Sequence, residues 1–517
     1  MRKVRRAAAV LGRWFADNPV RLWLVIFAAY LANRLVIVIG GPVYQSSDSA
    51  VYAPRTDPTL NHGPLISLIG HAPRPWTLPI FYAPFPDDQW RAVAQWALAT
   101  VAWAALAWEA GRHLRTRGGR YAVVAGVLLF GCLTEVASWD LAILTESLSI
   151  SLGVLVTALA LRWLRTRSWL ALAGTAFVTI CWTFLRPDTR VFTVVMIGVL
   201  GVDALWPSVV ALWNRWRDRG TARHRAAAGP DGTGGRTVTR RLIPGLAAAV
   251  VLVASIGWYA AITPGMERAM VPYDAGAIHP VPLPQPEQIR VFRLRVDVST
   301  DPAMWDAFRN QLGMPSCPEL DAFRSDPVWH EVQWAEAYTR CPALVTWVQA
   351  RENQNFWTEL ALKNPGLFLR KFGQEMSLNL GGAQYATAAH VIPAPVEKLV
   401  FPSRRYGLPV ALVFFAIALG LALWAGAYRA GGLVRRLFWA AIVIFGVAML
   451  SAAATIAVFT GELGRYGVQE AYASRLSVIL LLGCALDAAL QRRRARREAA
   501  AVSSPAAATQ GPTQAAA

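Results

Sequence analysis

Cysteine, histidine and acidic residues are all scarce in this chain of 517 residues, which has 5 Cys, 7 His and 32 Asp plus Glu. His62 and His71 share one segment, but they lack the close ligand spacing that is typical of zinc sites. Cys317 and Cys341 are the only cysteines outside the long apolar runs. A single disulfide between them is therefore a reasonable expectation, provided that their segment lies outside the cytoplasm.

Three kinds of sequence signal are also missing. There is no Gly-rich phosphate-binding loop or dinucleotide fingerprint, which argues against an ATP-driven pump or a nucleotide-sugar enzyme. No internal repeat is visible, which argues against a transporter built from inverted repeats. The first apolar run follows basic sequence and lacks a small-residue cleavage site, so no cleavable signal peptide is expected.

Long apolar runs dominate the chain. Hydrophobic residues make up 55% of it, and its mean hydropathy is +0.34. A run of about 20 apolar residues crosses the roughly 30 Å hydrocarbon core as a helix, because lipid cannot hydrogen-bond the backbone. Such runs lie near residues 21–40, 91–110, 120–138, 147–164, 168–185, 190–213, 243–263, 407–427, 436–458 and 474–490. The expected fold is an all-α polytopic membrane protein with about ten transmembrane helices.

The formal net charge of +19 is concentrated in alternate connections between these runs. The basic segments are 1–6, 111–120, 162–167, 214–241, 428–436 and 491–497. In contrast, segment 264–405 has 14 Lys plus Arg and 15 Asp plus Glu. The alternation follows the positive-inside rule and predicts a cell-membrane protein with both termini in the cytoplasm and 41–90 and 264–405 outside. Membrane lipid, and not nucleic acid, is the expected partner of the basic segments.

Four parts are expected along the chain. They are a transmembrane module over 1–263 with a catalytic outer loop at 41–90, an extracytoplasmic domain over 264–405, C-terminal transmembrane helices over 406–490, and a disordered cytoplasmic tail over 491–517. The outer domain should be mainly helical, since much of it places apolar residues at helical spacing. Asp301 and Asp326 each precede a proline that is suited to open a helix.

Acids and arginines gather at the expected outer ends of several spans. They are Asp48, Asp140, Glu146, Arg186, Asp188, Glu462 and Arg465. Ionisable groups so close to hydrocarbon are costly and therefore point to function. A carboxylate can act as a general base or hold a divalent cation, and arginine clamps phosphate. The pattern predicts an outer-face site for a phosphorylated lipid, although each residue also has a simpler interpretation as a loop charge, a helix start or an interface anchor.

The layout and five short motifs resemble the GT-C superfamily of membrane glycosyltransferases, which includes protein mannosyltransferases, aminoarabinose transferases and actinobacterial arabinosyltransferases. The motifs are SSDSAVY at 46–52, GHAPRPWTLPIFY at 70–82, WDLAILTESLSISL at 139–152, LRPDTR at 185–190 and KNPGLFLRKF at 363–372. The resemblance extends over roughly residues 20–480 in layout. It implies an inverting transfer of a sugar from a polyprenyl-phosphate donor to a glycan, lipid or protein acceptor of the cell envelope, in an active site that faces outside.

The resemblance also implies roles for individual residues. Asp48 would be the catalytic base, Glu146 and Asp140 would support the acceptor or a metal, and Arg186 and Arg465 would bind the donor phosphate. A divalent cation, Mg²⁺ or Mn²⁺, is the one cofactor that it leaves open, and no ligand is assigned to it beyond the supporting acids Glu146 and Asp140. The chain departs from members with a paired acid in the first loop, because Ser49 follows Asp48. The residue types suit the chemistry in their own right, since a leaving phosphate needs positive charge and an attacking alcohol needs a base.

Three other functions remain open from the sequence. A transporter or flippase for lipid-linked glycan would need charges part-way through several spans, for which Arg34 and Asp203 are the main candidates. A non-catalytic envelope assembly protein would bind a partner through its outer domain and would tolerate neutralisation of the outer acids. An oligosaccharide ligase or polymerase would depend on outer arginines and a histidine. Arg34 is also expected to snorkel to the membrane interface.

Overall fold

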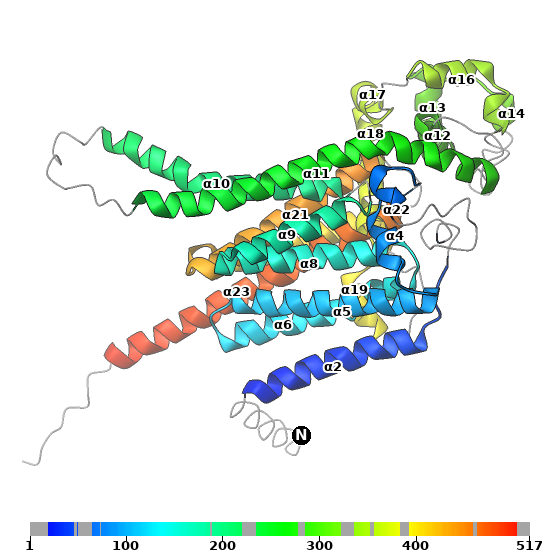
Figure 1. Cartoon of the computed structure of the whole chain (residues 1–517). Helices are drawn as coiled ribbons and strands as arrows, with labels where there is room; N and C mark the ends of the chain where they lie inside the picture. The colour runs from blue at the N-terminus through cyan, green and yellow to red at the C-terminus, as the bar shows by residue number, and fades with distance from the viewer. Residues whose placement is uncertain are drawn as a thin grey trace, which may run out of the picture.

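A computed structural model describes residues 19–45, 49, 65–72, 74–186, 189–219, 234–277, 285–321, 336–351, 356–382, 392–458 and 463–503. These residues form helices and no strand, and one isolated parallel bridge joins Tyr44 to Ala142. Long helices run side by side as a bundle, and a group of short helices lies at one end of it (Figure 1). The predicted all-α architecture is confirmed.

A helix lies at each of the ten predicted spans. They are α2 (Pro19–Gly40), α5 (Asp88–Arg112), α6 (Arg117–Gly131), α8 (Thr145–Thr166), α9 (Trp169–Thr183), α10 (Arg190–Arg219), α11 (Gly234–Ala277), α20 (Gly407–Trp424), α21 (Gly432–Val458) and α23 (Val468–Ser503). Helix α9 has 15 residues and is about 22 Å long, which falls short of the hydrocarbon core.

Six described stretches are long and apolar enough to cross a membrane. They are Val20–Ile39, Thr145–Thr166, Pro244–Ala269, Ala394–Trp424, Gly432–Ala457 and Val468–Ala500. A seventh crossing is counted if the bent pair Arg117–Gly131 and Thr134–Leu141 forms one span. The chain is thus a multi-pass membrane protein, whereas the predicted number of ten spans is not confirmed.

Side-chain caps explain where several helices begin. Asp87 precedes α5 and accepts a hydrogen bond from a backbone N–H of its first turn, and Thr116 does the same for α6. Asp301 accepts from two backbone N–H groups at the start of α13 (Pro302–Asn310), so the predicted Asp-Pro helix start is confirmed there. Asp326 lies outside the described residues.

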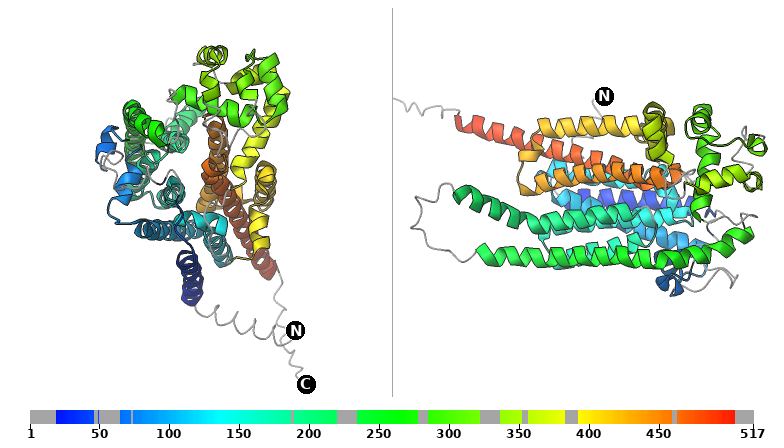
Figure 2. Two further views of the ribbon diagram at one scale, coloured as in Figure 1. Left: turned by 90° about the vertical axis from the view of Figure 1, so that its right-hand side faces the viewer. Right: turned by 90° about the horizontal axis from the view of Figure 1, so that it is seen from above.

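The short helices form a domain with its own core. They are α12 (Gln285–Arg293), the π-helical turn η4 (Leu294–Val298), α13, α14 (Pro318–Asp321), α16 (Pro342–Gln349), α17 (Phe356–Lys363) and α18 (Pro365–Leu380). Their buried cluster includes Phe308 and Trp347 and continues onto the membrane helices through Ala411 of α20 and Ile456 of α21. Figure 2 shows this domain at the end of the bundle opposite the protruding part of α23.

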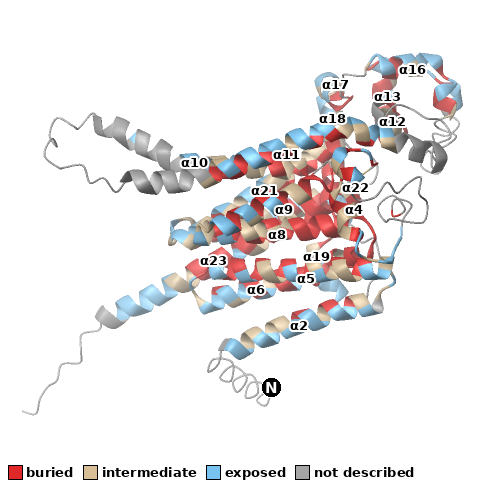
Figure 3. Ribbon diagram, in the orientation of Figure 1, coloured by how far each residue is buried: buried red, intermediate tan, exposed pale blue. Residues whose placement is uncertain are grey.

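Two features of the helix packing determine where the candidate site lies. Helix α11 continues as one helix past the predicted domain boundary at residue 263 and ends at Ala277. The bundle core lies mainly between α5, α6, α8, α21 and α23, and Figure 3 shows the buried residues along their inward faces. Gly483 of α23 allows the close approach to α6, because a Cβ atom there would lie 1.9 Å from the side chain of Val123.

Candidate functional site

Three of the predicted site residues meet at the bundle end that carries the short helices. Glu146 lies in the first turn of α8, Arg186 follows α9, and Arg465 lies in the short helix α22 (Leu463–Tyr466). The Nε of Arg465 donates to Glu146 Oε1 at 2.6 Å, and Arg186 Nη1 lies 3.0 Å from the same oxygen. All three side chains are buried. Residues far apart in the chain therefore form one ion cluster, which we call the Glu146 cluster.

The aromatic ring of Tyr466 completes this cluster. The guanidinium carbon of Arg186 lies 5.1 Å from the ring centroid and that of Arg465 lies 5.9 Å from it. Both distances are within the range of a cation–π interaction. Tyr466 was not among the predicted site residues, although its position directly after Arg465 was a usable signal. Among the described residues of the cluster, one carboxylate is shared by two guanidinium groups.

The position of Glu146 has a local physical reason. A carboxylate in the first turn of a helix is stabilised by the positive end of the helix dipole. The hydroxyl of Thr145 also donates to Glu146 Oε2 at 3.2 Å. Buried charges are costly unless they are paired, and each of these three charges has an opposite partner. The arrangement can serve as a structural anchor, as a binding site for an anion, or as both.

Asp140 belongs to a different ion pair. It pairs with Arg34 of α2, and its Oδ1 accepts from the hydroxyl of Ser147 at 2.9 Å. Arg34 also donates to Thr100 Oγ1 at 3.3 Å and to the carbonyl oxygen of Gly131 at 3.0 Å. The side chain of Arg34 is 1% exposed, so the prediction that it snorkels to the interface is wrong. The contacts of Asp140 hold α2 against the bundle.

The residue that follows the predicted catalytic base Asp48 in the chain is anchored to the bundle. Asp48, Asp188 and Glu462 lie outside the described residues. Ser49, next to Asp48 in the chain, is buried, and its hydroxyl donates to the carbonyl oxygen of Ile143 at 2.8 Å. Ile143 also donates through its backbone N–H to the carbonyl oxygen of Tyr44 at 3.1 Å. The first loop is thus attached on both sides of Asp48 to the segment that leads into Glu146.

An apolar cavity of about 350 Å³ starts close to the Glu146 cluster. At this end it is lined by Ser149, one turn after Glu146 in α8, and by Gln469 of α23. The hydroxyl of Ser149 donates to Gln469 Oε1 at 2.6 Å. The walls come from α8, α9, α10, α21 and α23, with Trp103 of α5, and the remote end is lined by Arg435 and Arg436. A cavity that runs between helices and has mainly apolar walls can accept a hydrocarbon chain.

A second group of buried charges lies where the short helices meet α21. Arg293 of α12 donates through Nη2 to two backbone carbonyl oxygens at the end of α21, each at 3.2 Å. Nearby, burial raises the pKa of Asp297 to about 6. Burial, and then the neighbouring Asp297 carboxylate, raises the pKa of Glu375 to about 8. Lys371 Nζ lies 3.9 Å from Glu375 Oε1 and limits this rise.

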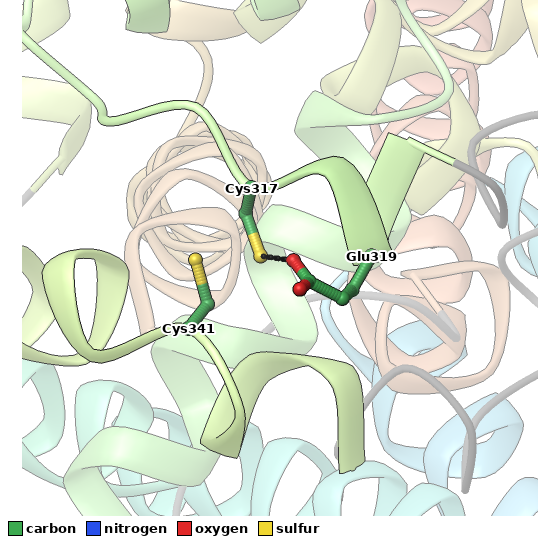
Figure 4. A group of neighbouring side chains, drawn as sticks. All are labelled: Cys317, Glu319 and Cys341. Atoms are coloured by element: carbon green, nitrogen blue, oxygen red, sulfur yellow. Dashed lines mark hydrogen bonds between the residues drawn. The ribbon is translucent and has the colours of Figure 1, made fainter.

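The predicted divalent cation has no fitting site among the described residues. Cys317, Glu319 and Cys341 bring their ligand atoms within 4.8 Å of one another (Figure 4). The Cys317 thiol donates to Glu319 Oε2 at 3.4 Å. Thiolates select soft ions, whereas Mg²⁺ and Mn²⁺ prefer oxygen ligands. At the Glu146 cluster, two guanidinium groups would repel a cation. No step of the chemistry proposed below therefore passes through a metal.

Comparison of the chain with protein-family models, with curated proteins and with solved structures found no match. The resemblance to the GT-C superfamily therefore rests on the short motifs and their order along the chain. A function for this protein has to be argued from the site itself, namely the Glu146 cluster, the loop attached beside it, and the apolar cavity that starts one helical turn away.

Proposed function

We propose that this protein is an inverting glycosyltransferase of the GT-C type, which moves a sugar from a polyprenyl-phosphate donor to an acceptor at the outer face of the cell membrane. The observation that carries the proposal is the buried Glu146 cluster, in which Arg186 and Arg465 share one carboxylate oxygen. A guanidinium group offers five N–H donors in a fixed fork, so it can contact a carboxylate and a phosphate together.

The proposed reaction is a single displacement. The acceptor hydroxyl oxygen attacks the anomeric carbon of the donor, and the bond between that carbon and the phosphate oxygen breaks. The hydroxyl proton passes to the carboxylate of Asp48, and polyprenyl phosphate leaves as a dianion. Arg186 and Arg465 stabilise the charge that develops on the phosphate, and removal of one such donor typically lowers a rate by about 10² to 10³.

In this proposal Glu146 positions the two arginines. Its Oε1 contacts a nitrogen of each guanidinium group, and the ring of Tyr466 lies against both. The apolar cavity would hold the first part of the polyprenyl chain, since Ser149 at its near end is one helical turn from Glu146. Asp140, which is paired with Arg34, acts on the site only through the structure of the bundle.

The test is a transfer assay with protein reconstituted in liposomes, a panel of radiolabelled polyprenyl-phosphate sugars and a cell-envelope glycan acceptor. Asp48→Asn should abolish transfer and leave donor binding intact. Arg465→Gln should lower kcat by about 10² to 10³. Arg405→Gln, at an exposed arginine just before α20, is the matched control and should behave as wild type. Equal transfer by all variants would overturn the site, and no transfer by the wild type with any donor would overturn the function.

A transporter for lipid-linked glycan is the second candidate, and the cavity favours it. The cavity passes between membrane helices from Ser149 and Gln469 at one end to Arg435 and Arg436 at the other. Asp203, which a transporter could use within a span, forms an ion pair with Arg167 at 2.6 Å instead. Movement of lipid-linked glycan across liposomes, without sugar transfer, would favour this candidate over the glycosyltransferase.

A further inference from the structure

The end of the apolar cavity remote from the Glu146 cluster is basic and aromatic. Arg435 and Arg436 lie in the first turn of α21 and line this end, and Trp439 follows one turn later. Trp163 of α8 lies opposite them in the lining. Arg436 donates through Nη1 to the backbone carbonyl oxygen of Leu164, which holds its guanidinium group at the cavity wall. Trp439 and Arg435 are exposed at the bundle surface.

The cavity has the length of a lipid chain. Its lining in α8 runs from Ser149 to Leu164, which is about 22 Å of helix, and its lining in α21 runs from Arg435 to Val447, which is about 18 Å. One leaflet contributes roughly half of the 30 Å hydrocarbon core. A chain that enters at the arginines can therefore lie parallel to the helices over the whole depth of its leaflet.

We propose that this end of the cavity binds an anionic phospholipid of the adjacent leaflet. The phosphate contacts Arg435 and Arg436, and one acyl chain occupies the part of the cavity next to them, while the part next to Ser149 stays open to the first isoprene units of a polyprenyl donor. Basic pockets between membrane helices bind anionic head groups, and arginine donors match phosphate oxygens. Trp439 lies one helical turn from Arg435, and tryptophan rings are enriched at the membrane interface. The proposal does not rest on the glycosyltransferase proposal, because the two head groups lie at opposite ends of the same cavity.

The structure favours a phospholipid over other phosphates. The apolar cavity starts at the two arginines. A ligand can therefore contact both the arginines and the cavity wall only if it carries an anionic head group and an acyl chain together. The head group of a polyprenyl-phosphate donor would instead lie at the Glu146 cluster. Arg429, in the turn that leads into α21, is not part of the cavity lining and contacts the ring of Tyr428 with its guanidinium carbon 4.9 Å from the centroid. It is therefore a matched control.

The experiment measures lipid retained by the purified full-length protein. Wild type is equilibrated with equal amounts of phosphatidylglycerol and phosphatidylcholine in detergent, and bound lipid is counted by native mass spectrometry. Wild type should retain phosphatidylglycerol selectively. Arg435→Gln combined with Arg436→Gln should lower this retention by about tenfold or more, whereas Arg429→Gln should not change it. Ala440→Trp, which fills the cavity and keeps both arginines, should lower retention as well.

Several outcomes would overturn the proposal. They are equal retention of the two lipids by wild type, an equal effect of the Arg429 variant and the double variant, and unchanged retention in the Ala440 variant. Displacement of the lipid by inorganic phosphate at the same concentration would also overturn it, since the arginines would then bind a simple anion. Thermal unfolding of each variant identifies any that fails to fold, and the two independent variants keep the proposal testable.

Discussion

Replacement of Glu146 by glutamine tests the buried cluster directly. Glu146 is 0% exposed, and its Oε1 accepts from Arg465 at 2.6 Å and lies 3.0 Å from Arg186. Glutamine keeps the size of the side chain and removes its negative charge, which leaves two buried guanidinium groups beside each other. Removal of one partner from a buried ion pair costs about 3–5 kcal/mol. Because glutamine retains an oxygen acceptor, we expect a loss of about 3 kcal/mol in the free energy of unfolding.

Thermal unfolding of the purified protein in detergent measures this loss. At about 2 °C for each kcal/mol in a large protein, the midpoint should fall by about 6 °C. Glu498→Gln is the matched control, because Glu498 pairs with Arg494 on the exposed part of α23 and should contribute under about 0.5 kcal/mol. Combining Glu146→Gln with Arg465→Gln should restore part of the stability, since one uncompensated charge is removed. An unchanged midpoint for Glu146→Gln would refute the ion cluster.

Three further predictions concern other positions. Burial is the main reason why the pKa of Glu375 is raised from 4.5 to about 8, so the folded state holds its proton more tightly than the unfolded state and the free energy of unfolding of the wild type should fall as the pH rises from about 5 to about 8. Glu375→Gln should flatten this dependence, and equal slopes of the unfolding midpoint against pH in the two proteins would contradict the reasoning. Cys317 and Cys341 are not joined to each other in the structure, where their sulfur atoms lie within 4.8 Å, so the expected disulfide is not formed there. If their domain lies outside the cytoplasm, alkylation of both in denatured protein from an intact membrane should require prior reduction, whereas labelling without reductant would show that no disulfide forms. Gly467→Ala should destabilise the protein by about 1–3 kcal/mol, because a Cβ atom there would lie 2.3 Å from atoms of α18. Gly420→Ala should stabilise α20 by about 0.5–1 kcal/mol, because a Cβ atom there has no atom within 4 Å. A higher unfolding temperature for Gly467→Ala than for Gly420→Ala would contradict this packing.

The positions of the helices followed from local sequence. Long apolar runs have no stable alternative to a helix in lipid, and the structure has a helix at each predicted span. The Asp301-Pro302 start of α13 was predictable because a cap and a proline act within one turn. The number of crossings was less predictable, since α9 and α6 have 15 residues each and length alone does not place them across a membrane. The end of α11 was also missed, because the helix continues through the expected boundary. The prediction of a disordered tail from residue 491 is wrong for 491–503, because α23 continues to Ser503.

The sequence by itself determined the class of protein and the group of charged residues worth testing, because run length, charge alternation and the cost of charge near hydrocarbon are local properties. Only the tertiary structure decided how those charges pair. Glu146 joins Arg186 and Arg465, whereas Asp140 joins Arg34, and no spacing along the chain distinguishes these partners. The cavity likewise exists only because six helices pack around it. Which helices become neighbours depends on the fit of their whole faces, and that fit is a property of the folded chain.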